Sequence, residues 1–489
     1  MNQAERGGTG ENGWRLFFVA VLVVGAALRA WLYLATHWSV GDALICFRFG
    51  DQFAAGHGLV YNPGQRLSSN TTALYTLLLG LGGSAGISIP LFARVLGIVC
   101  DVATLLMMQH LVKTAGCLRS PALRYGLPLA IYLFPLLAMY AVSGMETPLY
   151  VALTFFLLVR TLKGQDWLYY LAAALVLFCR PDGVIAIAAT GAYLTLQARK
   201  IPWRVALLLA AIGLAYALAN YLYYGSVFPY SVKLKAFFYH NTRYENFHFI
   251  ATRFFRRDWV LAVWLVLAAV TAIRLRRTPV VVLLGVTTAA LFCYLIFVAP
   301  GLRSYYVVSA VYVSSLLVGM GVCSWLETNL AKVFLPATIA GAAAYVAVVV
   351  VGGRIVFVEL QNARAEEKVT KEDVGLWLKE NTPENARVFV TALEVGYYAH
   401  RYMLDSPGLA TPEVLNAIKA NPRLDLFDQA NLVKADYLVI PVVDRTRADY
   451  RLLQVYACTN KLSEFENMTY GLYQRVSTSD SPTRRTDNQ

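Results

Sequence analysis

Long apolar runs, separated by short polar segments, fill the first 353 residues of the chain. A run of about 18 or more apolar residues is typical of a helix that crosses a bilayer. Eleven runs, some of them shorter than this, occupy residues 16–35, 88–112, 125–142, 148–159, 167–178, 184–196, 205–223, 259–273, 280–298, 307–326 and 334–351. The pattern predicts an all-α polytopic membrane module, residues 1–353, with about 11 transmembrane helices.

A further apolar segment, residues 71–81, runs into a glycine-rich stretch and is short for a membrane span. The distribution of charge between the loops decides whether this segment crosses the membrane, because lysine and arginine collect in cytoplasmic loops. Counting this segment as a span would put Arg274, Arg276 and Arg277 outside. We therefore expect a re-entrant or juxtamembrane helix here, with the N-terminus cytoplasmic and the chain after residue 354 extracytoplasmic.

From residue 354 the long apolar runs give way to a mixture of charged and apolar positions. Residues 388–392 and 437–443 are rich in β-branched residues and predict strands. Residues 363–379, 415–418 and 424–430 predict helices. We expect a small α/β extracytoplasmic domain over residues 354–475, followed by a disordered polar tail over residues 476–489.

Composition supports the membrane assignment. Of the 489 residues, 57% are apolar and 15% are charged, against about 25% charged in soluble domains. The mean hydropathy is +0.50 and the net charge is +13. The cations are scattered through short loops without a dense patch, which argues against nucleic-acid binding. Seven cysteines without a CxxC spacing support neither a metal site nor a disulfide framework.

One predicted outer loop departs from the charge rule. Residues 224–258 lie on the translocated side but contain six cations, Lys233, Lys235, Arg243, Arg253, Arg256 and Arg257. An anionic ligand or lipid headgroups would account for them.

The first predicted outer loop, residues 41–79, is unusually polar. It contains Asp42, Arg48, Asp51 and His57. The predicted topology brings further polar residues to the same face of the membrane, namely Glu146, Arg180, Asp182, Lys233, Lys235, Arg303, Tyr305 and Tyr306. Ionisable residues near membrane depth are costly and usually functional. A shared face therefore favours a single outer cavity.

Carboxylates beside arginine and lysine, next to lipid, suit transfer of a sugar from a polyprenyl phosphate. A carboxylate takes the proton of an acceptor hydroxyl, and cations stabilise the departing phosphate. The sugar carbon passes through an oxocarbenium-like state, as it does in glycoside hydrolysis.

Five motifs, in order along most of the chain, carry a family resemblance. The chain resembles GT-C-fold, polyprenyl-phosphate-dependent glycosyltransferases, and among them mycobacterial-type terminal arabinofuranosyltransferases and bacterial pilin arabinosyltransferases. The motifs are the first-loop residues 42–78, with FRF at 47–49 and GHGLVYNPG at 56–64; GMET at 144–147; RPDG at 180–183; residues 224–235, with Tyr224-Gly225, Pro229 and Lys233-Leu234-Lys235; and Asp405 with Gly408-Leu409.

The resemblance implies an enzyme of the cell (inner) membrane whose substrates are a polyprenyl-phosphate sugar and a glycan or protein acceptor. It implies a catalytic carboxylate in the first outer loop, and Asp42 is the match. Expected donor- or substrate-binding residues are Arg48, His57, Glu146, Arg180, Asp182, Lys233, Lys235, Arg303 and Tyr306. The family usually has two adjacent acids where this chain has Gly41-Asp42. No metal ligands are assigned, and nothing in the sequence supports a divalent metal.

Most of these residues also have a structural interpretation. Asp42 and Glu146 are suited to cap the helices that follow them. Arg48 and Asp51, or Arg180 and Asp182, would form ion pairs. His57 would be a turn residue, and Lys233 and Lys235 would be headgroup anchors. Within the spans, Arg94 and Asp101 are expected to be structural, and Arg29 is expected to snorkel outward.

Two other functions remain open. A lipid or sugar transporter or flippase would show half-sequence repeats and helices broken at mid-membrane, and the sequence shows neither. A non-catalytic scaffold for envelope assembly is favoured by Gly41 in place of an acid.

Overall fold

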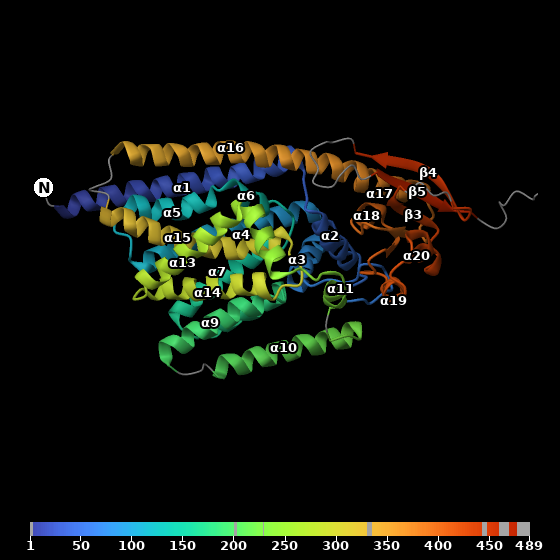
Figure 1. Ribbon diagram of the computed structural model, residues 1–489, viewed down its shortest axis with the longest axis horizontal. Coiled ribbons are helices and arrows are strands. Elements are labelled where there is room, and N and C mark those ends of the chain that lie inside the picture. The colour runs from blue at the N-terminus through green and yellow to red at the C-terminus, as the bar shows by residue number, and fades with distance from the viewer. Residues whose placement is uncertain are drawn as a thin grey trace, which may run out of the picture.

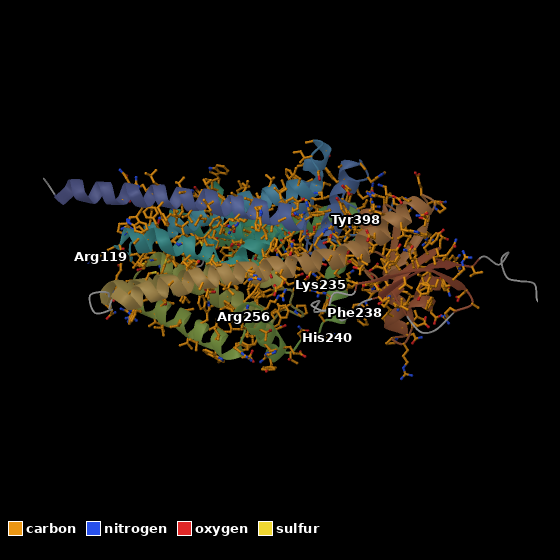
Figure 2. The ribbon with its side chains drawn as sticks, turned by 90° about the horizontal axis from the view of Figure 1, so that it is seen from above. Arg119, Lys235, Phe238, His240, Arg256 and Tyr398 are labelled. Atoms are coloured by element: carbon orange, nitrogen blue, oxygen red, sulfur yellow. The ribbon has the colours of Figure 1, made fainter. Side chains whose placement is uncertain are left out.

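The computed structural model describes residues 3–199, 203–227, 229–329, 335–442, 447–458 and 469–476. A helical bundle forms one end of the elongated molecule and a small α/β unit forms the other (Figure 1). Seen from above, Arg119 lies at the far end of the bundle, and Lys235 lies between the bundle and the α/β unit that contains Tyr398 (Figure 2).

The bundle is built from helices of very different length. Its elements are α1 (Gln3–Thr36), α4 (Ile89–Ala115), α5 (Pro121–Tyr132), α6 (Pro135–Ala141), α7 (Thr147–Lys163), α8 (Trp167–Cys179), α9 (Gly183–Ala198), α10 (Trp203–Tyr224), α13 (Asp258–Arg274), α14 (Pro279–Phe297), α15 (Ser304–Asn329) and α16 (Leu335–Glu367). α16 lies along α1 and continues past Arg354 toward the α/β unit without a break (Figure 1).

Within the described ranges, six helices are long and apolar enough to cross a membrane, or seven if the pair α5 and α6, bent by 61°, forms one span. This arrangement is that of a multi-pass membrane protein. The predicted spans at 148–159, 167–178, 184–196 and 259–273 correspond to helices of 17, 13, 16 and 17 residues. Eleven spans therefore stays a prediction.

The first loop folds into two helices at the end of the bundle nearest the α/β unit (Figure 1). They are α2 (Gly41–Ala54) and α3 (Ala73–Ser84). α3 has 12 residues, is shorter than a span, and packs against α2 and α4. Pro229 then precedes α11 (Tyr230–Phe238), which is followed by α12 (Arg243–Ile250) and the π-helix η1 (Ala251–Phe255).

The α/β unit contains a five-stranded mixed sheet of order β2-β1-β3-β5-β4. Strands β2, β1 and β3 are parallel, whereas β5 is antiparallel to both β3 and β4. The elements are η3 (Lys368–Glu372), α17 (Asp373–Asn381), β1 (Arg387–Val390), α18 (Val395–Ala399), β2 (Tyr402–Asp405), α19 (Pro412–Ala420), α20 (Leu426–Leu432), β3 (Tyr437–Pro441), β4 (Tyr450–Ala457) and β5 (Thr469–Arg475). The tail predicted to be disordered, apart from its first residue, lies outside the described residues.

The first loop joins the two hydrophobic cores. Phe47 of α2 is buried in the core of the bundle, whereas Phe49 and Tyr61 are buried in the core of the α/β unit. The buried amide of Asn62 makes two bonds to the backbone of Met403 on edge strand β2, donating to its carbonyl at 2.8 Å and accepting from its N–H at 2.9 Å. The segment that begins with Asp42 is thus fixed between the two parts.

One expectation about the membrane-depth charges is wrong. Arg29 does not snorkel outward, because it is 2% exposed and its Nε donates to Asp101 at 2.6 Å. Tyr312 of α15 donates to the other oxygen of Asp101 at 2.7 Å. This buried cluster links α1, α4 and α15 inside the bundle.

Candidate active site

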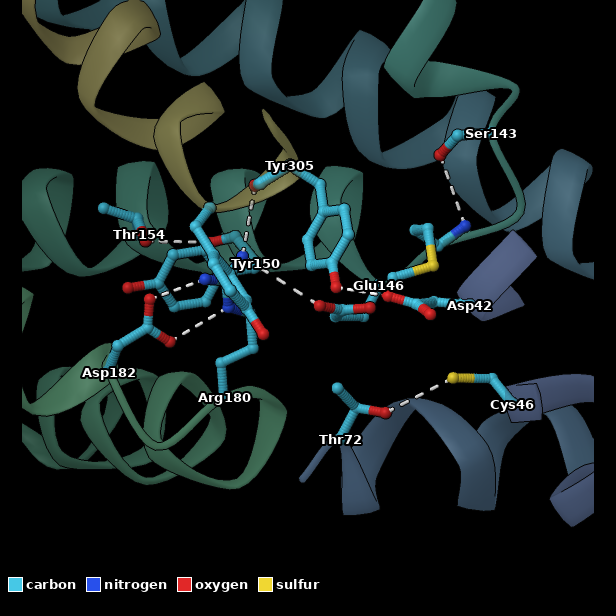
Figure 3. A network of polar contacts seen from close by, with 12 residues as sticks. Asp42, Cys46, Thr72, Ser143, Glu146, Tyr150, Thr154, Arg180, Asp182 and Tyr305 are labelled. Atoms are coloured by element: carbon cyan, nitrogen blue, oxygen red, sulfur yellow. Dashed lines mark hydrogen bonds and ion pairs between the residues drawn. The ribbon is translucent and has the colours of Figure 1, made fainter. Parts of the chain in front are cut away.

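Asp42 lies at the start of α2, and its side chain points toward those of Tyr305 and Glu146 (Figure 3). The hydroxyl of Tyr305, in the first turn of α15, donates a hydrogen bond of 2.5 Å to Oδ2 of Asp42. The N-cap of α2 is Val40, and no side chain caps the helix. Asp42 is therefore held by Tyr305 and does not act as the helix cap.

Arg180 is the central cation of the site and is 2% exposed. Its guanidinium donates twice to Asp182, from Nε to Oδ1 at 2.9 Å and from Nη2 to Oδ2 at 2.6 Å. Nη1 donates to the carbonyl of Tyr305 at 3.3 Å. Arg180 and Asp182 are two residues apart in the sequence, and both lie in the short turn between α8 and α9. The turn brings the guanidinium and the carboxylate together, which makes this two-bond pairing possible. Tyr305 thus contacts Asp42 through its side chain and Arg180 through its backbone.

Two aromatic rings enclose the guanidinium. The Cζ atom of Arg180 lies 4.6 Å from the ring centroid of Tyr150 and 4.6 Å from that of Tyr306. Such contacts with desolvated arginine are attractive, so the rings hold the group in place.

Glu146 contributes a second carboxylate to the same site and is 1% exposed. It precedes α7 at the N-cap position, but its side chain makes no capping bond. Its Oε1 lies 3.9 Å from Nη1 of Arg180, and its Oε2 has no hydrogen-bond partner among the described residues. A buried oxygen without a partner is rare in native proteins and marks a place where a ligand donor fits.

Two further cations approach the site, Lys235 from α11 and Arg303 from the turn just before α15. Nζ of Lys235 on α11 donates to the hydroxyl of Tyr306 at 2.5 Å. Nη2 of Arg303 donates to the hydroxyl of Tyr239 at 3.0 Å. Both cations are close enough to interact electrostatically with Asp42. Asp42, Glu146, Asp182, Arg180, Lys235 and Arg303 therefore form one charged cluster.

Three of the residues expected in the site lie elsewhere. Arg48 points toward the α/β unit, where its Nη1 lies 3.1 Å from Nδ1 of His400. His57 is exposed beyond the end of α2, and because a helix of 14 residues is about 20 Å long, it is far from Asp42. Lys233 is exposed on α11.

Asp51 is near enough to Arg48 to interact with it electrostatically, but the two side chains form no ion pair in the described part of the chain. Burial raises the pKa of Asp51 to about 6, and the nearby guanidinium opposes this rise. Arg48 therefore does not form the expected ion pair with Asp51 and contacts the α/β unit instead.

Sequence reasoning missed two tyrosines of the site, Tyr150 and Tyr239. It placed Tyr305 on the same face of the membrane as Asp42 but did not include it among the expected donor- or substrate-binding residues. Within the described part of the chain, no group of three histidine, cysteine, aspartate or glutamate side chains is arranged to hold a metal ion.

Chemically, the cluster combines a half-buried carboxylate, that of Asp42, with several cations. A carboxylate in this setting can accept a proton from a hydroxyl. Buried arginine and lysine side chains can stabilise the negative charge of a departing phosphate.

Comparison with known proteins agrees with this fold. A family model described as "Domain of unknown function (DUF8728)" matches residues 359–477. A terminal β-(1→2)-arabinofuranosyltransferase of Mycobacterium tuberculosis is 29% identical over 225 residues, which are 42% of this chain and 36% of that relative. The match thus spans little more than a third of the relative's length.

Two solved structures share the fold. ArnT from Cupriavidus metallidurans bound to undecaprenyl phosphate superposes with a TM-score of 0.61 at 12% identity, over 96% of this chain and 99% of ArnT. The oligosaccharyltransferase AglB from Archaeoglobus fulgidus, in complex with an inhibitory peptide and a dolichol-phosphate, has a TM-score of 0.54 at 13% identity, over 87% of this chain and 69% of AglB. The resemblance to GT-C glycosyltransferases that the motifs indicate is confirmed.

Proposed function

We propose that this protein is a membrane glycosyltransferase that transfers a sugar from a polyprenyl-phosphate donor to a glycan or protein acceptor. The observation that carries the proposal is the Asp42 carboxylate, held by Tyr305 at 2.5 Å beside the buried guanidinium of Arg180. A base and a phosphate-stabilising cation in one cluster are the two groups that this reaction needs.

In the proposed reaction, Asp42 accepts the proton of the acceptor hydroxyl as its oxygen attacks the anomeric carbon. The bond between this carbon and the phosphate oxygen breaks, and the polyprenyl phosphate leaves with the bonding electrons. Arg180, Lys235 and Arg303 stabilise the negative charge on that phosphate. Glu146, through its unpartnered Oε2, accepts hydrogen bonds from sugar hydroxyls.

Arabinofuranose is the sugar that we propose, since the sequence relative is an arabinofuranosyltransferase. A lipid-linked donor is supported by the undecaprenyl phosphate bound to ArnT and the dolichol-phosphate bound to AglB. The peptide bound to AglB is consistent with a protein acceptor, and the arabinofuranosyltransferase with a glycan acceptor.

The proposed orientation places the site at the outer face of the cell membrane. The N-terminus would be cytoplasmic, residues 1–353 would form the transferase module, and residues 354–475 would form an extracytoplasmic domain. The basis is the distribution of lysine and arginine between the loops.

The test is transfer from a polyprenyl-phosphate-linked arabinofuranose to a synthetic arabinan acceptor by the purified full chain in nanodiscs. We expect transfer by the wild type and a loss of at least about a thousandfold in Asp42→Asn, because the amide cannot accept the proton. Asp51→Asn, at the other end of the same helix, is the control that keeps transfer. Equal turnover by Asp42→Asn and wild type would contradict the role of Asp42.

A further inference from the structure

The first residue of α2, Gly41, touches a charged pair from the α/β unit. A Cβ atom at this position would lie 2.8 Å from Oε1 of Glu394 and 3.2 Å from Nζ of Lys371. Gly41 is not among the glycines with a positive φ. A side chain at this position would therefore displace the end of the Glu394 side chain, so the small size of Gly41 and not its backbone conformation lets the pair lie against the start of α2.

The pair itself is well defined. Nζ of Lys371 lies 3.8 Å from Oε1 of Glu394, and the two side chains are 23% and 18% exposed. Glu394 stands at the N-cap of α18, and the carbonyl of the preceding Leu393 accepts a hydrogen bond from the hydroxyl of Tyr61. The first loop therefore holds the backbone beside Glu394 while the Glu394 carboxylate contacts the start of α2.

A carboxylate at this place has an electrostatic effect on α2. The N-cap residue, Val40, offers no side-chain acceptor to the first turn. The first amides of a helix lack partners within it and carry partial positive charge, so a nearby carboxylate stabilises that end. Glu394 supplies this negative charge from the α/β unit.

We propose that Glu394, paired with Lys371, is a positioning residue for Asp42. Asp42 directly follows Gly41, so a shift in the first turn of α2 moves the base. Tyr305 holds the carboxylate of Asp42 from the bundle, and Glu394 holds the turn that carries it from the α/β unit. The α/β unit thereby takes part in building the site. This inference rests on the proposed transferase function.

The pair also adds two charges of opposite sign near Asp42. The other groups that interact with Asp42 are Tyr305, Lys235, Arg303 and Glu146. Glu394 itself interacts with Lys371, Tyr61 and Tyr470. A neutral side chain at position 394 no longer repels the negative charge of the Asp42 carboxylate, and a neutral side chain at position 371 no longer attracts it.

The experiment measures kcat against pH for the full chain in nanodiscs, in wild type, Glu394→Gln and Lys371→Met. The acidic limb of kcat reports the base in the enzyme–substrate complex. We expect this limb to move to lower pH in Glu394→Gln and to higher pH in Lys371→Met, each by about 0.3–0.5 pH unit, because charges that interact through a watery environment contribute less than about 1 kcal/mol. A purely structural role would not produce shifts of opposite sign.

The control is Asp428→Asn, which removes a carboxylate of the same unit that pairs with Arg447 on its exposed side. Its acidic limb should coincide with that of wild type. A second comparison uses Gly41→Ala, in which the added Cβ displaces the end of the Glu394 side chain, and we expect kcat to fall.

The outcomes separate the two proposals. If wild type transfers no sugar, the proposed function fails. If wild type transfers sugar but the two acidic limbs stay in place or move the same way, the positioning role of Glu394 is overturned and the proposed function stands.

Discussion

Tyr305 donates a hydrogen bond of 2.5 Å to Asp42, although 263 residues separate them in the chain. The backbone carbonyl of the same tyrosine accepts a bond from Arg180 at 3.3 Å. One residue of α15 therefore sets the relative positions of the proposed base and the proposed phosphate-binding cation.

Removal of this hydroxyl tests the link. A donor to a carboxylate favours its ionised form, so Tyr305→Phe should move the acidic limb of kcat to higher pH. A hydrogen bond to a charged group contributes about 1.5–3 kcal/mol, so kcat should fall by roughly ten- to a hundredfold. The measurement is kcat against pH in nanodiscs, with Tyr312→Phe, which lies deep in the bundle, as the matched tyrosine control. An unchanged profile in Tyr305→Phe would show that the bond does not tune Asp42.

The buried pair of Arg180 and Glu146 gives a prediction about stability. Arg180→Met removes the charge that faces Glu146 and Asp182, and loss of one partner of a buried ion pair costs about 3–5 kcal/mol. Glu146→Gln in the Arg180→Met background removes one of the stranded charges and should recover part of that loss. Denaturant unfolding in detergent measures both, with the exposed Arg423→Met as control. No recovery in the double variant would mean that Glu146 does not depend on Arg180 for its charge.

The cluster of Arg29, Asp101 and Tyr312 should affect stability without affecting chemistry. Asp101→Asn leaves Arg29 without its anion inside the bundle, so we expect the unfolding free energy to fall by about 3 kcal/mol. The kcat of the folded fraction should stay at the wild-type value, because the cluster lies apart from Asp42. Arg29→Met/Asp101→Leu should be more stable than Asp101→Asn, since neither charge remains. A large fall in kcat for the folded fraction would assign this cluster a role in transfer.

Much of this arrangement follows from local features of the sequence. Loop charge alone brought Glu146, Arg180 and Asp182 to the face that carries Asp42, because the positive-inside rule constrains every later loop at once. β1 and β3 were visible because they are short apolar runs. β4 was not, because most of its side chains are exposed and it lacks such a run.

The contacts that complete the site depend on chain folding over long distances. Arg48 meets His400 across 352 residues, and no local pattern records that contact. Tyr305 is one of 30 tyrosines, and its residue type does not distinguish it from those that anchor membrane helices. The space filled by Glu394 beside Gly41 is equally invisible without coordinates, since a glycine in sequence shows neither its neighbours nor the reason for its small size.

The contact between Arg48 and His400 makes the docking of the α/β unit sensitive to pH. Partial burial, together with the positive charges of Arg48, Lys379 and Arg401, lowers the pKa of His400 to about 4. The folded protein therefore binds fewer protons than the unfolded chain between that pKa and the ordinary histidine value of about 6.5. Stability should rise with pH across this window and fall as the medium is acidified from about 6.5 toward 4.

His400→Gln keeps a hydrogen-bond acceptor for Arg48 but cannot be protonated, so it should flatten this part of the profile. The melting temperature of the full chain, measured from pH 4 to 7 in detergent, gives the slope for both proteins. His57→Gln, at an exposed turn, is the matched histidine control and should keep the wild-type slope. Equal slopes for wild type and His400→Gln would place the acid sensitivity in other groups. A smaller slope in His400→Gln alone would show that a neutral imidazole at the Arg48 contact helps hold the two parts of the molecule together.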